Sequence, residues 1–250
     1  MRNLKNKVAL ITGGTSGIGL ATAEEFINEG LKVIITGRSQ NTIDETVRKL
    51  GSNTYGVVSD AGKMQDLHVL AAQVQAISPK IDILFINAGY GKFASVEMVD
   101  EALFNELFNV LVKGTFFTAQ QLLPMINEGG SIIFNTSFVT EFGFQNFSIY
   151  SAAKSAVQSF IKTLAAECTS RKIRVNGISP GHIMTDIFNK TGLSPEQIKD
   201  VTESIIPTIP LARFGRPSEI ARTVSFLASD DASYIHATEI RVDGGLSKIW

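Results

Sequence analysis

Short apolar runs alternate with longer amphipathic segments along the whole chain. The runs have the length of buried strands, and the segments between them carry apolar residues at the three- and four-residue spacing of helices. The runs predict strands at 8–11, 31–36, 54–58, 82–86, 131–135, 173–179 and within 238–245. The segments predict helices at 21–30, 41–50, 64–77, 101–126, 150–164 and 217–229.

This alternation predicts an α/β fold with a doubly wound (Rossmann) parallel sheet. Strands separated by helices of this length are joined by right-handed crossovers, so seven of them form a seven-stranded parallel sheet with helices on both faces. We expect residues 1–250 to form a single domain. The alternation is interrupted at about 182–213, where Ser194 to Gln197 has the pattern of a capping box that begins a short helix. This insertion is a candidate lid over a ligand crevice.

Composition excludes several classes of protein. The chain has 250 residues, 44% of them hydrophobic, and 23 basic against 24 acidic residues, so no basic surface for nucleic acid is expected. A single cysteine, Cys168, excludes an intramolecular disulfide framework, and His68, His182 and His236 show no metal-ligand spacing. No metal is therefore expected. No apolar run is long enough for a membrane span or a secretory signal, so we expect a cytoplasmic protein.

The first expected strand leads directly into a glycine-rich loop, Thr12-Gly-Gly-Thr-Ser-Gly-Ile-Gly19. Glycine permits a tight turn and the close approach of a pyrophosphate, and the following helix offers free N–H groups and the positive end of its dipole. A glycine pattern alone is weak evidence, but a strand before it and a helix after it are the context of a dinucleotide loop. The expected contacts are Gly13, Thr15, Ser16, Gly17, Ile18 and Gly19.

Ser137, Tyr150 and Lys154 are the candidate catalytic residues. Tyr150 and Lys154 lie four residues apart at the start of an expected helix and therefore share one face, and Ser137 follows the strand before that helix. Together a phenol, an ammonium and a hydroxyl can move a proton to or from a carbonyl or alcohol oxygen. An ammonium at ~4 Å supplies about 4 kcal/mol at an effective dielectric of about 20, enough to lower a phenol pKa by roughly 3 units. Taken singly, each residue is also explained as an ordinary helix or strand residue.

Five motifs in order resemble the classical short-chain dehydrogenases/reductases: TGGTSGIG at 12–19, NAG at 87–89, Ser137, YSAAK at 150–154 and SPGHIMT at 179–185. The resemblance covers essentially the whole chain, including RFGRPSEIA at 213–221 and VDGG at 242–245. It implies an oxidoreductase that interconverts a ketone and a secondary alcohol of a small molecule, with Tyr150 as acid or base. Lys154 would support Tyr150 and bind the nicotinamide ribose, and Ser137 would orient the substrate oxygen. The family also implies a homotetramer or a homodimer, built on the fourth and fifth helices.

The resemblance implies where the cofactor binds. NAD-using members carry Asp where Gly37 stands here, and Arg38 follows it. A guanidinium binds a phosphate through paired, charge-assisted hydrogen bonds, so we expect NADP(H) rather than NAD(H), although Arg38 could also be an ordinary solvated residue. Asp60 is either an adenine contact or a turn-former ahead of Gly62. The full set of further expected contacts is Ser39, Asp60, Ala61, Asn87, Ala88, Gly89, Tyr150, Lys154, Pro180, Gly181, Ile183 and Thr185.

The fourth helix departs from the family pattern. Relatives usually place Asn three residues before a glycine, where it helps to hold a water that relays protons to the lysine, but Leu111 occupies this position before Gly114. Asn109 lies about 200° around an ideal helix and cannot substitute. A catalytically weak NADP-binding sensor or regulatory protein is therefore the alternative function.

The segment between Ser137 and Tyr150 and the expected lid are rich in large apolar residues. They predict an apolar pocket for a hydrophobic ketone or alcohol, although core packing or a subunit interface explains them about as well. The residues are Phe138, Phe142, Phe144, Phe147, Ile187, Phe188, Ile205 and Ile206.

Overall fold

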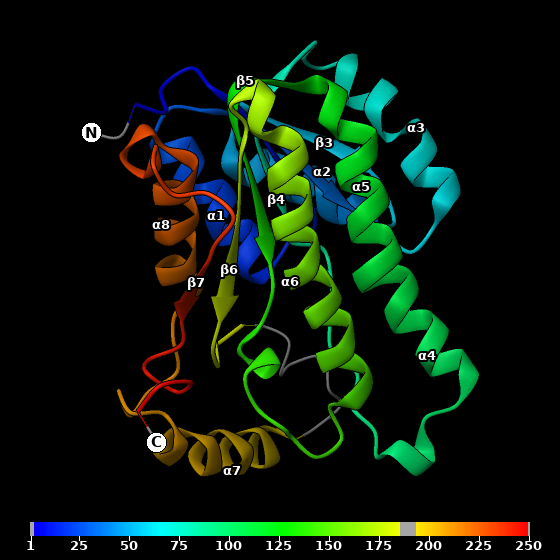
Figure 1. The fold of residues 1–250 in the computed structure, drawn as a ribbon, viewed down its shortest axis with the longest axis vertical. Coiled ribbons are helices and arrows are strands. Elements are labelled where there is room, and N and C mark those ends of the chain that lie inside the picture. Colours follow the sequence, from blue (N-terminus) through cyan, green and yellow to red (C-terminus); the bar gives the residue numbers. More distant parts are fainter. Residues whose placement is uncertain (1–2, 186–193, 250) are drawn as a thin grey trace.

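The computed structural model describes residues 3–185 and 194–249. Its centre is a parallel seven-stranded sheet with the order β3-β2-β1-β4-β5-β6-β7 (Figure 1). The chain builds outward from β1 to β3, returns to β4 beside β1, and continues to β7, which is the predicted doubly wound fold. The strands are β1 (Val8–Ile11), β2 (Lys32–Gly37), β3 (Thr54–Val58), β4 (Ile81–Ile86), β5 (Ile126–Asn135), β6 (Arg174–Pro180) and β7 (Glu239–Val242).

Helices cover both faces of the sheet. One face packs against α1 (Gly17–Asn28), α2 (Gln40–Leu50) and α8 (Pro217–Ala228). The other packs against α3 (Met64–Gln75), α5 (Thr115–Leu122) and α6 (Ser148–Cys168), with α4 (Glu101–Phe108) beside α6. Neighbouring strand residues such as Leu10 and Ile11 belong to opposite clusters. Because both faces are buried, the strands read as continuous apolar runs in the sequence.

The segment predicted as one helix at 101–126 is interrupted by a π-helical turn in the structure. A π-helical turn, η2 (Asn109–Gly114), joins α4 to α5, and a 3-10 turn (Leu123–Met125) ends the segment. A Cβ at Gly114 would lie 2.1 Å from the carbonyl oxygen of Ala61, so the turn runs against the backbone of the loop after β3. The spacing of apolar residues does not reveal a turn that holds one extra residue, so the sequence did not predict this π-helical turn. Such turns often lie at functional sites.

The short helix α7 (Pro195–Ile205) lies below the carboxyl ends of the strands (Figure 1). Its capping box is confirmed: Gln197 N–H donates to Ser194 Oγ, and Ser194 N–H donates to Gln197 Oε1. Ile205 and Ile206 are half-buried at its end, whereas Ile187 and Phe188 lie outside the described residues. Among the helices of residues 3–185 and 194–249, none is long and apolar enough to cross a bilayer.

Candidate active site

The loop after β4 is tied to the glycine loop after β1. Thr12 Oγ1 accepts the N–H groups of Asn87 and Ala88 at 2.9 and 3.0 Å. Gly17 has φ +53°, and a Cβ there would lie 3.4 Å from Thr185 Cγ2, so the loop after β6 also reaches the glycine loop. A Cβ at Gly19 would lie 2.2 Å from Gly13 O, which leaves no room for any other residue. The residues expected at the pyrophosphate and at the nicotinamide therefore lie together.

The structure brings the three candidate catalytic residues together. Ser137 precedes a short 3-10 turn after β5, and Tyr150 lies in the first turn of α6. The Ser137 hydroxyl lies close enough to the Tyr150 phenol to lower its pKa. Lys154 is buried, with Nζ 5.8 Å from the centroid of the Tyr150 ring, and donates a hydrogen bond of 2.7 Å to the carbonyl of Asn135. This arrangement places a proton donor pair next to a buried cation.

Burial shifts both titrating groups of this cluster. It raises the pKa of Tyr150, and the Ser137 hydroxyl opposes it by less. Our expectation that Lys154 brings this pKa down toward neutrality was wrong for this arrangement, because the ammonium bonds the Asn135 carbonyl and desolvation dominates at the phenol. Burial also lowers the pKa of Lys154 from 10.5 to about 8, and the negative charge of Glu239 opposes this shift.

Asn135, the last residue of β5, is a site residue that the sequence analysis missed. Its Nδ2 donates to Asn87 Oδ1 at 2.9 Å, and Asn87 Nδ2 donates to the Thr12 carbonyl at 3.0 Å. With the bond from Lys154 to the Asn135 carbonyl, these contacts form a polar line from the glycine loop to the lysine. An Asn at the end of the apolar run 131–135, two residues before Ser137, was the available signal.

The expected adenosine end of the site lies after β2. A Cβ at Gly37 would lie 3.0 Å from Thr15 Cγ2, so an acidic side chain there would force Thr15 to move. The exposed Arg38 has its guanidinium carbon 5.8 Å from the ring centroid of Tyr90, a residue that the sequence analysis did not single out. The Tyr90 hydroxyl donates to Glu106 at 2.6 Å, and burial together with this bond raises the pKa of Tyr90 to about 12.

In the loop after β3, Asp60 stabilises the turn ahead of Gly62, which was one of its two expected roles. Its Oδ1 accepts the N–H of Gly62 at 3.0 Å, and its own N–H donates to Asp66 at 2.8 Å. Ala61 contributes the carbonyl that faces Gly114. Ser39 is the residue before α2, and its hydroxyl forms no capping bond there. An adenine contact by Asp60 stays a prediction.

The loop after β6 forms the expected nicotinamide end. Pro180 ends β6, and Gly181 N–H donates to the carbonyl of Val242 at 3.0 Å. Ile183 forms an isolated parallel bridge with Gly215, whose bonds use the His182 carbonyl and the Met184 N–H at 2.9 Å each. In such a bridge the central residue's own N–H and C=O point away from the partner. Ile183 therefore has both groups free of this bridge, and their contact with a carboxamide stays a prediction.

The three histidines lie in different surroundings. The His182 ring lies between Phe138 and Phe214, with centroids 4.7 and 5.7 Å away, and burial lowers its pKa. His236 Nδ1 accepts the N–H of Val175 at 3.1 Å, and His68 is exposed on α3. Within the described residues there is no group of three or more His, Cys, Asp or Glu placed to bind a metal ion.

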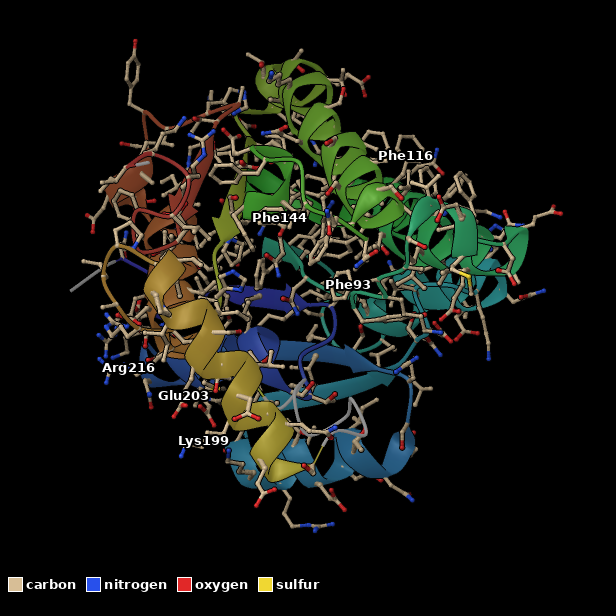
Figure 2. The ribbon with its side chains drawn as sticks, turned by 90° about the horizontal axis from the view of Figure 1, so that it is seen from below. Phe93, Phe116, Phe144, Lys199, Glu203 and Arg216 are labelled. Carbon is tan, nitrogen blue, oxygen red and sulfur yellow. The ribbon has the colours of Figure 1, made fainter. Side chains whose placement is uncertain are left out.

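Aromatic rings line one side of Tyr150. Phe93, in the loop after β4, stacks on Phe147 with centroids 4.1 Å apart and meets the Tyr150 ring edge-on at 5.7 Å. Phe147 lies 5.5 Å from Phe144, and Figure 2 shows Phe93 and Phe144 near each other when the molecule is seen from below. Phe138 is buried and packs in one cluster with Phe147 and Tyr150. Phe93 is 51% exposed and had not been predicted.

Comparison with known proteins decides the class. Residues 13–247 match the family model described as enoyl-(acyl carrier protein) reductase. The chain belongs to the short-chain dehydrogenase/reductase (SDR) family of oxidoreductases. It is 37% identical to the 3-oxoacyl-(acyl-carrier-protein) reductase of Thermotoga maritima over 249 residues, and the aligned region covers 97% of this chain and 98% of that protein. It is 35% identical over 256 residues to versicolorin reductase of Emericella nidulans, with 97% and 96% covered. The structure of L-sorbose reductase from Gluconobacter frateurii, complexed with NADPH and L-sorbose, has a TM-score of 0.91 at 31% identity and covers 98% of each chain.

This SDR has an apolar contact at the position of the usual Asn. Leu111 lies in the π-helical turn and is 1% exposed. A Cβ at Gly89 would lie 2.7 Å from Leu111 Cδ2, so the leucine packs against the loop after β4. Asn109 is exposed. Position 111 therefore offers no polar side chain to Lys154.

Proposed function

We propose that this SDR is an NADP(H)-dependent oxidoreductase that interconverts a ketone and a secondary alcohol on a hydrophobic small molecule. The observation that carries the proposal is the placement of buried Lys154, with Nζ 5.8 Å from the centroid of the Tyr150 ring, beside a phenol whose pKa the Ser137 hydroxyl lowers. Contacts through Asn135 and Asn87 connect Lys154 to the glycine loop. A substrate oxygen at the Tyr150 and Ser137 hydroxyls would therefore lie close to a dinucleotide bound at that loop.

In the direction of reduction, Tyr150 acts as the general acid and Ser137 orients the substrate oxygen. The raised pKa keeps the phenol protonated at neutral pH, which suits proton donation. Lys154 places a positive charge near the phenolate that remains after the proton leaves. A bound nicotinamide would supply the hydride, and oxidation of an alcohol follows the same path in reverse.

The residues present fit a dinucleotide that carries a 2′-phosphate. The glycine loop leaves its backbone open beside Thr185, and the N-terminus of α1 offers free N–H groups. Thr15 narrows the space next to Gly37 where an NAD-type carboxylate would stand, and Arg38 provides a cation there. The presence of NADPH in the related L-sorbose reductase supports the same choice. Ser39, Asp60, Ala61, Asn87, Ala88, Gly89, Pro180, Gly181, Ile183, Thr185, Tyr150 and Lys154 complete the proposed cofactor set.

The substrate is proposed to be apolar because the rings of Phe93, Phe147 and Phe144 stand beside Tyr150. Residues 1–250 would act as one catalytic domain, with α7 as part of a lid below the strand ends. A tetramer or dimer stays a prediction. Phe116 of α5, 44% exposed and 5.4 Å from Phe160 of α6, agrees with an interface on that side.

The test is NADPH oxidation, followed by absorbance, over a panel of apolar and polar ketones with NADH in parallel. We expect turnover of apolar ketones, and a loss of at least about 10²-fold in Tyr150→Phe, because the general acid is removed. Tyr234→Phe is the matched control, since Tyr234 is fully exposed. The sensor alternative is favoured by Leu111 alone. Tight NADPH binding without turnover of any carbonyl or alcohol would replace the proposed enzyme by that sensor.

A further inference from the structure

Arg38 and Tyr90 meet across the groove in which the dinucleotide is proposed to bind. Arg38 directly follows β2 and Tyr90 follows β4, and β1 lies between these two parallel strands in the sheet. The guanidinium carbon of Arg38 nevertheless lies 5.8 Å from the centroid of the Tyr90 ring, which is within the range of a cation–π interaction. The contact therefore spans the carboxyl end of β1, where the glycine loop begins.

The glycine loop lies between the two elements that carry this contact. Gly14 N–H donates a hydrogen bond of 3.0 Å to the carbonyl of Thr36, near the end of β2. A Cβ at Gly13 would lie 3.0 Å from the Cα of Ala88, in the loop that also carries the tyrosine. The arginine and the tyrosine thus stand on the two sides of the loop that is proposed to hold the cofactor.

The Tyr90 ring is held by polar and by apolar contacts. Its hydroxyl donates a hydrogen bond of 2.6 Å to Glu106 of α4, and Lys92 Nζ lies 2.7 Å from the same carboxylate. The ring is half-buried and packs against the apolar cluster that contains Leu107 and Leu111. A ring fixed in this way can order an exposed side chain that lies against it, and so reduce the conformational entropy which that side chain loses on binding a ligand.

The nearby carboxylate of Glu106 does not bind Arg38 directly. Hydrogen bonds from Lys92 and Tyr90 lower the pKa of Glu106 most, and the charge of Arg38 adds a smaller effect in the same direction. The ion pair of Glu106 is formed with Lys92, at 2.7 Å. Within the part of the chain that the structure describes, no ion pair joins Arg38 to an acidic side chain, so its N–H groups are available to a phosphate.

We propose that Tyr90 is a positioning residue for the preference for NADP(H), and that its ring holds the Arg38 guanidinium over the groove where the 2′-phosphate binds. The inference rests on the proposed function for its cofactor, and it adds a residue outside the expected cofactor set. Because the ring lies across the groove from β2, it orders the arginine before the dinucleotide arrives. The alternative is that Tyr90 only ties the loop after β4 to α4 through Glu106.

The test compares the binding of 2′,5′-ADP and 5′-AMP to the full chain by isothermal titration calorimetry, since these adenosine fragments differ only in the 2′-phosphate. Tyr90→Leu removes the ring and should weaken 2′,5′-ADP binding about threefold while AMP binding stays unchanged. Tyr90→Phe keeps the ring and should retain the wild-type preference. In the background of Arg38→Leu, where the preference is already lost, adding Tyr90→Leu should change neither affinity.

Tyr55→Leu is the matched control. Tyr55 is another exposed tyrosine whose ring carries a cation, with Lys32 Nζ 4.5 Å from the ring centroid. Lys32 begins β2, whereas Arg38 follows its last residue, so this second contact lies at the opposite end of the strand. The substitution should leave the affinities for both fragments unchanged.

An unchanged preference in a cooperatively folded Tyr90→Leu would overturn the proposal. An equal loss for both fragments would overturn it too, because it would indicate the merely structural role. If Tyr90→Leu does not fold, NMR of the chain with ¹³C-labelled tyrosine rings decides, with Tyr90→Phe identifying the Tyr90 signal. Substitution of the exposed arginine in Arg38→Leu should shift that signal in the free protein, and an unshifted signal would overturn the contact.

The outcomes for this inference and for the proposed function are separate. A preference for 2′,5′-ADP that is lost in Arg38→Leu and kept in Tyr90→Leu would overturn the role of Tyr90 and leave the proposed NADP(H) site in place. Failure of all ketone turnover in a protein whose preference depends on both residues would refute the proposed reaction and support this inference.

Discussion

Burial of Lys154 should make the stability of this protein depend on pH in a defined window. The pKa of Lys154 falls from 10.5 to about 8 on folding, so the unfolded chain holds this proton more tightly than the folded protein does. Stability therefore carries a penalty below pH 8 that is relieved as the pH rises from about 8 to 10.5. The shift corresponds to about 3 kcal/mol in total, of which about 2 kcal/mol is recovered between pH 7 and 9.5.

Urea unfolding of the wild type and Lys154→Met at pH 7 and 9.5 measures this contribution. Other groups that titrate in this pH range contribute equally to the pH dependence of stability in both proteins. The Asn135 carbonyl loses its hydrogen bond in Lys154→Met, but it has no charge and therefore adds no pH dependence. The difference between the two pH values should therefore be about 2 kcal/mol more favourable for the wild type. Lys162→Met, an exposed lysine on the same helix, is the matched control and should behave as the wild type.

The result that would refute this reasoning is an identical pH dependence in the wild type and Lys154→Met. It would mean that Lys154 keeps an ordinary pKa on folding, and that water or a charge offsets its burial. A smaller pH dependence in the Lys162→Met control would instead show that the assay reports general surface charge.

Three further substitutions test separate parts of the site. Arg38→Leu should raise the KM for NADPH at least about tenfold and leave that for NADH nearly unchanged, since a charge-assisted phosphate contact is lost; equal changes for both cofactors would contradict the 2′-phosphate role. Phe93→Ala should raise the KM for apolar ketones by several fold without changing NADPH affinity measured by fluorescence, and a selective loss of NADPH binding would place Phe93 elsewhere. Asn135→Ala leaves the Asn87 side-chain oxygen unpaired and should destabilise the protein by about 1–3 kcal/mol in urea unfolding while weakening NADPH binding. An unchanged midpoint and affinity would show that the polar line is dispensable.

The sequence predicted the fold because each strand is buried on both faces and separated from the next by a helix-length segment. Val8–Ile11 and Thr54–Val58 have the predicted bounds. The start of β5 was missed because Ile126 pairs with Ile81 across a register shift, which apolar runs do not encode. The π-helical turn at Asn109–Gly114 was missed because the spacing of apolar residues does not reveal it; the turn runs against the backbone of Ala61, which is distant in sequence.

The site was predicted where residue type and spacing alone define it. Ser137, Tyr150 and Lys154 meet because one strand end and one helix turn carry them. Asn135 and Phe93 were missed because their roles arise from neighbours in space, Asn87 and Phe147, rather than from a motif. The pKa of Tyr150 was misjudged because a Coulomb estimate between two groups omits the desolvation that burial imposes on one of them.

The most direct test of the proposed chemistry is transfer of deuterium from NADPH deuterated at nicotinamide C4 to an apolar ketone. We predict that the product alcohol carries deuterium on the former carbonyl carbon, and that the product disappears with Tyr150→Phe while NADPH still binds. If the wild type binds NADPH and forms no deuterated alcohol from any ketone, or if Tyr150→Phe retains full transfer, the central claim is contradicted.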